Sequence, residues 1–133
     1  MEQAMPIGAA TGLVLVVEDE PLVRLMAVTE FESRGWQTLG SPSAEHALSL
    51  LDGHLIDALF TDINLDGSMD GWALARHLRE RIPGLVVVYT SGRTNDNAER
   101  VENSRFFDKP YVPADIVNAC AELLNDVPRK TGA

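Results

Sequence analysis

Short runs of apolar residues recur along the chain, and polar residues follow each of them. Their length and their content of Val, Leu and Phe are typical of strands buried in a parallel sheet. Longer segments with apolar residues at helical spacing separate the runs. We therefore predict five strands, over residues 13–17, 36–39, 57–61, 85–89 and 105–107.

Local signals mark where several helices begin and end. Pro21 suits a first helical position, and Gly35 is a natural stop. Ser43 offers an N-cap for a second helix that ends near Gly53. The segment 95–101 has a poor apolar stripe, which indicates a short or irregular helix. About five helices are predicted in all, the last three over residues 72–81, 95–101 and 113–124.

Strands that alternate with helices predict the α/β class. With right-handed crossovers, the chain should form a doubly wound five-stranded parallel sheet, for which we favour the flavodoxin-like strand order 2-1-3-4-5. That order places the carboxyl ends of strands one, three and four side by side. Ligands of such sheets bind at this edge.

The residues expected at this edge suit metal-assisted phosphoryl chemistry. Asp19 follows strand one and Asp62 follows strand three, and carboxylates that meet there repel unless a cation binds. Oxygen ligands favour Mg²⁺, and without clustered His or Cys nearby zinc is disfavoured. An aspartate can accept a phosphoryl group, whose oxygens the Thr90 hydroxyl and the Lys109 ammonium could hold. Lys109-Pro110 indicates a tight turn compatible with a cis bond.

Composition limits the classes of function. A chain of 133 residues suits one domain, for which we predict boundaries at 12–127 between flexible tails 1–11 and 128–133. The net charge of −9 argues against binding to nucleic acid or to anionic membranes. A single cysteine, no long apolar span and no secretory signal lead us to expect a cytoplasmic protein.

The ordered motifs resemble those of the response-regulator receiver domain, the phosphoacceptor module of two-component signalling, over about residues 12–127. They are similar to those of single-domain chemotaxis-type regulators, and comprise residues 16–20, Asp62, residues 69–71, residues 90–92 and Lys109-Pro110. The resemblance implies these roles: phosphoacceptor Asp62, direct metal ligand Asp19, second acid of the pair Glu18 acting through water, backbone metal ligand Asn64, switch hydroxyl Thr90, phosphate-binding Lys109 and switch aromatic Phe106.

Several positions depart from the family pattern. Glu18 stands where an aspartate is commoner, and Asp66 stands where a proline is common. The loop after Asp62 is one residue longer before Met69-Asp70-Gly71. The interval from Thr90 to Lys109 is shorter than in many members, which again predicts a short fourth helix. Phe106 has no hydroxyl, and its roles as a switch and as a fixed core aromatic stay open.

The resemblance implies a receiver that accepts phosphate from a sensor histidine kinase or a histidine phosphotransfer protein. It would catalyse its own phosphorylation and dephosphorylation with Mg²⁺, without being a conventional enzyme. A chain of 133 residues has no room for a DNA-binding output domain. We therefore expect signalling by partner binding or phosphate relay, as a monomer or a phosphorylation-dependent dimer.

Three alternatives remain open. The chain could be the receiver fragment of a hybrid histidine kinase. A magnesium-dependent aspartyl-phosphate phosphohydrolase is a second possibility, although such enzymes usually carry an aspartate where this chain has Asn64. A flavin- or nucleotide-binding module is disfavoured, because the acids at 18–20 would repel phosphate.

Glu20 is expected to be a favourable acid beside the first turn of a helix, and Asp70 a loop residue that accepts local hydrogen bonds.

Overall fold

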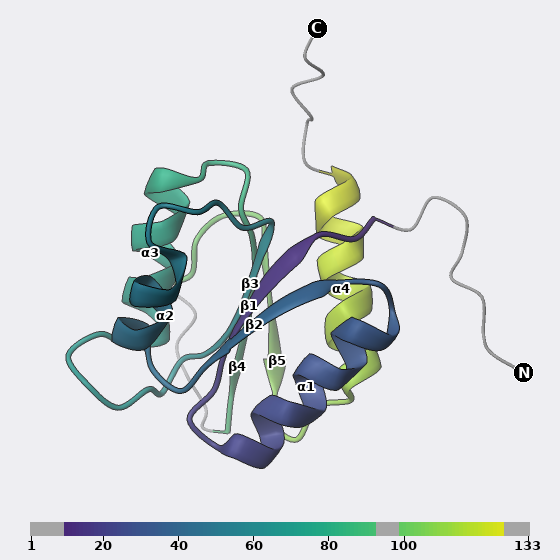
Figure 1. Cartoon of the computed structure of the whole chain (residues 1–133), viewed down its shortest axis with the longest axis horizontal. Helices are drawn as coiled ribbons and strands as arrows, with labels where there is room; N and C mark the ends of the chain where they lie inside the picture. The colour runs from purple at the N-terminus through teal and green to yellow at the C-terminus, as the bar shows by residue number, and fades with distance from the viewer. Residues whose placement is uncertain (1–9, 93–98, 127–133) are drawn as a thin grey trace, which may run out of the picture.

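A parallel five-stranded sheet forms the centre of the computed structural model, which describes residues 10–92 and 99–126 (Figure 1). The strand order is β2-β1-β3-β4-β5, as predicted. Every neighbouring pair of strands is parallel. The strands are β1 (Leu13–Val17), β2 (Gln37–Ser41), β3 (Ala58–Asp62), β4 (Val86–Ser91) and β5 (Ser104–Asp108).

Four helices among the described residues cover the two faces of the sheet (Figure 1). They are α1 (Pro21–Ser33), α2 (Ala44–Leu51), α3 (Gly71–Arg81) and α4 (Pro113–Asp126). Helices α1 and α4 lie on one face, and α2 and α3 lie on the other. The predicted helix over 95–101 falls mostly on residues 93–98, which lie outside the described part of the chain.

Local sequence signals act as expected at the helix ends. Pro21 occupies the first turn of α1, and Gly35 follows this helix with a φ of +91°. The Ser43 side chain caps α2 by accepting a hydrogen bond from the His46 N–H. Strand β2 begins one residue later and ends two residues later than predicted. Trp36 instead packs edge-on against Phe31, with ring centroids 5.3 Å apart.

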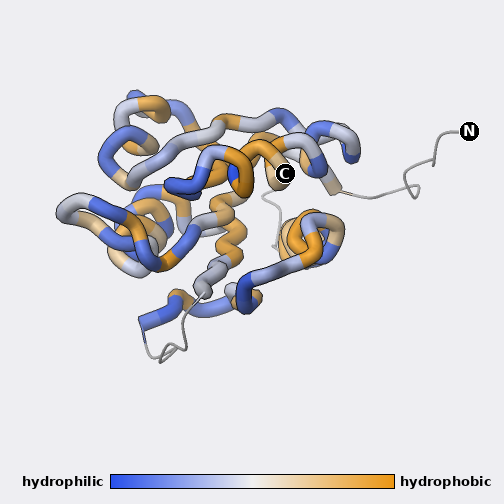
Figure 2. Tube along the Cα trace, turned by 90° about the horizontal axis from the view of Figure 1, so that it is seen from below, coloured by the Kyte–Doolittle hydropathy of each residue, from blue (hydrophilic) through white to orange (hydrophobic). Residues whose placement is uncertain are grey.

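Alternate side chains of the central strands pack into two separate hydrophobic cores, one on each face of the sheet. Leu15, Leu59 and Val87 point toward α2 and α3. Their neighbours on the strands, such as Val16 and Phe60, point toward α1 and α4. The hydrophobic segments accordingly run through the middle of the molecule (Figure 2). Strands buried on both faces explain why the sequence shows continuous apolar runs rather than alternation.

No helix of the described residues combines the length and the apolar character needed to cross a membrane.

Candidate functional site

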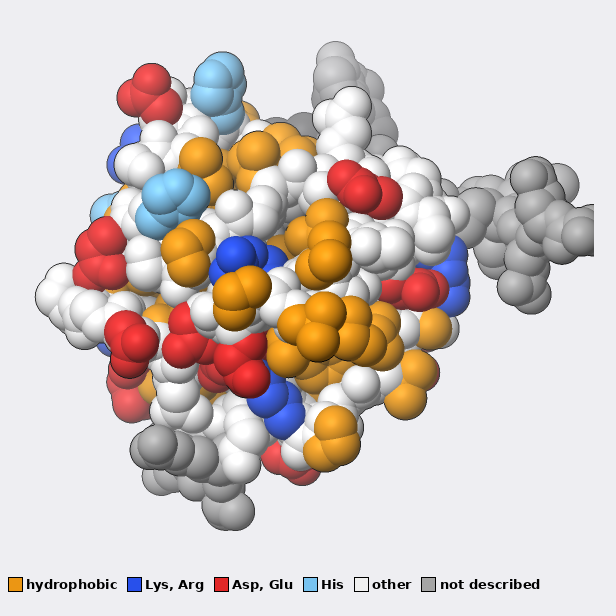
Figure 3. Space-filling model, turned by 60° about the horizontal axis from the view of Figure 1, so that its bottom comes forward, with side chains coloured by type: hydrophobic (Ala, Val, Ile, Leu, Met, Phe, Trp, Pro, Cys, Tyr) orange, Lys and Arg blue, Asp and Glu red, His pale blue; other side chains and the backbone are white. Residues whose placement is uncertain are grey.

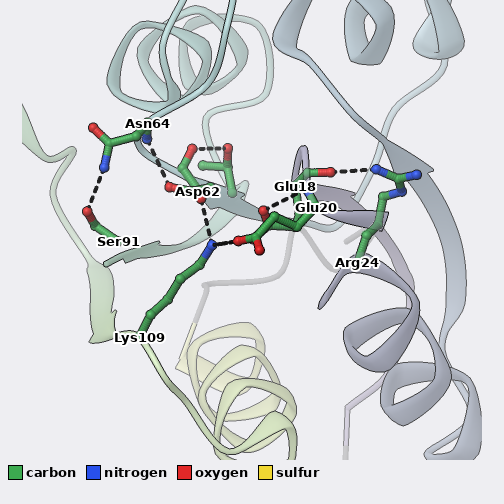
Figure 4. A network of polar contacts seen from close by, with 8 residues as sticks. Glu18, Glu20, Arg24, Asp62, Asn64, Ser91 and Lys109 are labelled. Carbon is green, nitrogen blue, oxygen red and sulfur yellow. Dashed lines mark hydrogen bonds and ion pairs between the residues drawn. The ribbon is translucent and has the colours of Figure 1, made fainter. Parts of the chain in front are cut away.

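Three strand ends bring one ammonium group between two buried carboxylates (Figure 4). Lys109 follows β5, and its Nζ lies 2.8 Å from Asp62 Oδ2 at the end of β3. The same Nζ lies 2.7 Å from Oε1 of Glu18, which follows β1. Asp62 is 5% exposed and Glu18 is 2% exposed. The strand order therefore assembles the predicted acid–lysine site from residues far apart in the chain.

For both Glu18 and Lys109, burial shifts the pKa in one direction and the neighbouring opposite charge shifts it in the other. Burial raises the pKa of Glu18 above its ordinary value, and the hydrogen bond from Lys109 opposes this shift only in part. Burial alone would lower the pKa of Lys109, but its hydrogen bonds to Asp62 and Glu18 raise that pKa overall. Lys109 is therefore held in its charged form by the carboxylates around it.

Glu20 joins this group, a role that its position beside a helix start did not predict. It is the N-cap residue of α1, but its side chain makes no capping hydrogen bond. Its Oε1 lies 3.5 Å from Lys109 Nζ, and its backbone N–H donates to Glu18 Oε2 at 3.1 Å. The one signal available in the sequence was its place directly after the acid pair.

The acids after β1 have the donor atoms that a hard divalent cation requires. Carboxylate oxygens of Glu18, Asp19 and Glu20 all lie within 4.8 Å of one another. Oxygen ligands are those that Mg²⁺ prefers, and it commonly takes one or two carboxylates and keeps several waters. The carboxylates here carry more negative charge than the single ammonium of Lys109 can neutralise. The residues therefore fit the predicted cation.

Thr90 presents a buried hydroxyl beside Asp62. It pairs with Asp62 in the register between β3 and β4 and is 1% exposed. Its Oγ1 has no hydrogen-bond partner among the described residues. A buried hydroxyl without a partner is costly. Thr90 can therefore donate to a new acceptor at this edge without breaking an existing bond.

Asn64 connects Asp62 to the end of β4. Its backbone N–H donates to Asp62 Oδ1 at 2.9 Å, and its side-chain Nδ2 donates to Ser91 Oγ at 2.8 Å (Figure 4). The first bond holds one carboxylate oxygen of Asp62 while Lys109 holds the other. The role of the Asn64 carbonyl as a metal ligand stays a prediction.

The loop after Asp62 is held without the proline common in the family. Glu45, in the first turn of α2, accepts hydrogen bonds from Ser68 N, Ser68 Oγ and Met69 N at 2.9, 2.7 and 3.2 Å. The bond from the Ser68 hydroxyl is the main reason that the pKa of Glu45 is lowered. Asp70 caps α3 by accepting from Ala73 N at 2.9 Å, which confirms the expected local hydrogen bonding.

Gly71 lies directly against the backbone of Asp62 and Ile63. Its N–H donates to the Ile63 carbonyl at 2.9 Å. A Cβ added there would lie 2.8 Å from Ile63 Cα and would also collide with the Asp62 carbonyl. Only glycine allows this close approach, so the glycine of the Met69-Asp70-Gly71 motif sets the position of Asp62.

We expect Gly71→Ala to lower the free energy of unfolding by roughly 2–3 kcal/mol, because a methyl group there must displace backbone rather than a side chain. Urea denaturation measures this effect. Gly40→Ala is the control, since its Cβ would meet only Arg24 and Val28 side-chain atoms at 3.6 Å. Equal stability of the two variants would contradict the proposed backbone contact.

The remaining aromatic residues lie on either side of the sheet. Phe106 is partly buried on β5, pairs with Tyr89 in register, and packs against the core beneath α2 and α3. Tyr111, which the sequence analysis did not single out, packs edge-on against Phe60 with centroids 5.3 Å apart. Burial, followed by the charge of Glu18, raises the pKa of Tyr111 to about 12. The Lys109–Pro110 bond that precedes it is cis.

Comparisons with known proteins agree with this geometry. The family model of the response regulator receiver domain matches residues 14–121. The chain is similar to the sensor kinase CckA of Brucella abortus, with 31% identity over 88% of this chain and 13% of that protein. It is similar to the aerobic respiration control protein ArcA of Escherichia coli, with 27% identity over 86% of this chain and 49% of that protein. It thus spans less than two thirds of either relative.

A solved structure shows the same architecture. The response regulator receiver protein from Sinorhizobium medicae matches with a TM-score of 0.81 and 30% identity, over 92% of this chain and 99% of that one. The match of the family model covers most of the chain, and both the predicted strand order and the acid–lysine site are present. The chain therefore belongs to the response regulator receiver domain family.

Proposed function

We propose that this receiver domain accepts a phosphoryl group on Asp62 from a phosphohistidine of a sensor kinase or a phosphotransfer protein. The observation that carries the proposal is the bridging of Asp62 and Glu18 by Lys109 Nζ, at 2.8 and 2.7 Å. A buried carboxylate held beside an ammonium is oriented for attack, and the ammonium can neutralise charge on a transferred group.

In the proposed transfer, an Asp62 carboxylate oxygen attacks phosphorus while the bond from phosphorus to the histidine nitrogen breaks. The imidazole leaves with the electron pair of that bond and takes up a proton. The product is an acyl phosphate on Asp62. Lys109 would stay beside the phosphoryl oxygens, and the unpartnered Thr90 hydroxyl would donate to one of them. Hydrolysis by water later restores the carboxylate.

Magnesium would be held by Asp19 and Asp62, with the Asn64 carbonyl as a third ligand and Glu18 acting through water. When bound, it would supply positive charge to the phosphoryl oxygens. This assignment rests on the family pattern and on the oxygen-rich acidic group after β1. Phe106 as a switch aromatic, and the domain boundaries at 12 and 127, likewise remain proposals.

The test is covalent labelling of the native chain. With Mg²⁺ and acetyl phosphate or a phosphorylated kinase, intact-mass spectrometry should show one added phosphoryl group that is stable to acid and labile to alkali. Borohydride reduction followed by peptide mapping should locate it at Asp62. EDTA should prevent labelling. A native chain that stays unlabelled would refute the proposal, and rapid turnover of unrelated phosphomonoesters would favour a phosphohydrolase.

An apolar surface beside the site suits the phosphodonor. It consists of the exposed side chains of Leu22, Leu25 and Met26 on α1 and of Val112 after β5, which we call the α1 patch. A groove of about 400 Å³ extends from this patch to Lys109, which contacts Asp62, and is lined by Val23, Met26, Lys109, Pro110, Tyr111 and Pro113. Figure 3 shows hydrophobic side chains gathered beside acidic and basic ones on this face. A partner that brings its histidine to Asp62 must cover this surface.

Leu25→Asp is therefore expected to slow phosphotransfer from the cognate kinase at least tenfold, because an apolar contact becomes a charge in the interface. Labelling by acetyl phosphate should be unchanged, since a small donor does not need the surface. Leu55→Asp, which changes an equally apolar exposed residue outside the α1 patch, is the control. Equal rates for the two variants with the kinase would argue against docking on the α1 patch.

Glu18→Gln is expected to raise the free energy of unfolding by about 1 kcal/mol in metal-free buffer, because it removes one of several carboxylates crowded around a single ammonium. It should also weaken Mg²⁺ binding. Urea denaturation with EDTA measures the first effect, and a magnesium titration of tryptophan fluorescence measures the second. Glu30→Gln, which changes a surface pair with Arg34, should alter neither property. Lower stability of Glu18→Gln would contradict the expectation.

A further inference from the structure

A second cavity lies at the opposite end of the sheet from Asp62. It has a volume of about 370 Å³ and is lined by residues from the C-terminal turns of α2 and α3 and from the segments that follow them. Its residues precede the first residues of β3 and β4, whereas Asp62 ends β3. They are Leu48, Leu51, Gly53, His54, Leu55, His77, Leu78, Arg81 and Ile82. The volume is in the range of small-molecule sites.

The polar side chains that line this cavity share one property: none has a partner among the described residues. Every other described lysine and arginine makes a hydrogen bond or an ion pair, but Arg81 makes none. His46, outside the cavity, bonds to Ser41 Oγ, whereas the His54 and His77 rings have no hydrogen-bond partner within residues 10–92 and 99–126. One guanidinium and two imidazoles without partners among the described residues therefore line the same cavity.

Apolar side chains form the floor of the cavity. Leu51 and Leu78 are buried there, and Leu48 and Ile82 are partly buried. Leu55 is 72% exposed, and the other large exposed hydrophobic residues of the described segments belong to the α1 patch. Its exposure is thus explained by neither the core nor the proposed docking surface. The cavity combines an aliphatic floor with a rim that carries one guanidinium and two imidazoles.

We propose that this cavity binds a small carboxylic acid with an unbranched aliphatic chain. The alkyl chain would lie on the leucine floor, and the carboxylate would pair with the Arg81 guanidinium, whose fork matches carboxylate geometry. A single negative charge suits the site better than a phosphate would. The chain carries a net charge of −9, and the carbonyl ends of α2 and α3 disfavour further negative charge nearby.

Octanoate is the probe, titrated into the full chain and followed by ¹H–¹⁵N NMR. We expect a dissociation constant on the order of 1 mM, with shifts at Leu55 and His77. Hexanoate should bind roughly tenfold more weakly, because two fewer CH₂ groups are buried. 1-Octanol should also bind about tenfold more weakly, because it lacks the charge that Arg81 recognises.

Matched variants on α3 test the head group. Arg81→Gln should weaken octanoate binding about tenfold. Arg76→Gln should leave it unchanged, because Arg76 lies outside the cavity and pairs with Glu99 at 3.2 Å. Leu55→Ser tests the floor independently and should also weaken binding. Circular dichroism confirms that each variant is folded.

Several outcomes would overturn the proposal: no binding at about 10 mM octanoate, equal affinity for 1-octanol, or full affinity in Arg81→Gln. Shifts confined to Met26 and Tyr111 would place the ligand in the groove beside Lys109 instead. Since the cavity shares no residue with the acid–lysine site, the labelling of Asp62 does not depend on any of these results.

Discussion

Asp62→Asn is expected to reduce phosphorylation of the chain by at least roughly a thousandfold, because a carboxamide is not a nucleophile at phosphorus. The substitution keeps the size of the side chain, and its carbonyl oxygen can still accept the Asn64 N–H that now meets Oδ1 at 2.9 Å. Lys109 retains Glu18 as a partner at 2.7 Å. The fold should therefore persist while the chemistry is lost.

The measurement is the rate of phosphoryl incorporation from acetyl phosphate with Mg²⁺, followed by intact mass. Asp66→Asn is the matched control, since Asp66 is an exposed acid in the loop just after the acceptor. It should label at the native rate. If Asp62→Asn labelled as fast as Asp66→Asn, the phosphoacceptor would have to be another residue.

Lys109→Gln is expected to have two large effects. The rate of phosphorylation should fall about a hundredfold, because the ammonium beside Asp62 no longer stabilises charge on the transferred group. The free energy of unfolding in metal-free buffer should fall by about 3 kcal/mol, because two buried carboxylates lose their cation. Mg²⁺ should restore part of that stability by binding the acids that Lys109 had neutralised.

Urea denaturation with and without Mg²⁺ measures the stability change, and the labelling assay measures the rate. Arg105→Gln is the control, because its pair with Glu122 joins side chains that are 41% and 61% exposed. A pair of this kind contributes little. If Lys109→Gln were no more destabilised than Arg105→Gln, the group formed by Glu18, Asp62 and Lys109 would not stabilise the resting fold.

Much of the fold and the candidate residues could be predicted because the signals are local. The runs 13–17 and 85–89 are apolar throughout, and only strands covered on both faces have that pattern. The predicted strand order is the one observed. It then places Asp62, Thr90 and Lys109 at one edge without any knowledge of side-chain packing. The ends of β2 were less predictable, because the burial of Trp36 against Phe31 depends on α1.

The contacts that hold the site could not be predicted from the sequence. Glu45 lies 23 residues before Ser68, and its carboxylate holds the loop in which Asp66 stands where a proline is common. Gly71 resembles an ordinary helix start until its backbone is found against Ile63. Glu20 was expected only to favour the helix start, yet its Oε1 lies 3.5 Å from Lys109. Each of these contacts depends on where another segment of the chain lies in the folded structure.

The sequence alone established the α/β sheet, its strand order and the identity of the acids, hydroxyl and lysine at its edge. The apolar runs of the buried strands and the spacing of the motifs along the chain are sufficient to predict these features. The tertiary structure alone decided how those groups share charge: one ammonium between Asp62 and Glu18, and a Thr90 hydroxyl without a partner. Hydrogen bonds and ion pairs require positions within about 3 Å. Only the packing of β1, β3, β4 and β5 against their helices sets positions that finely.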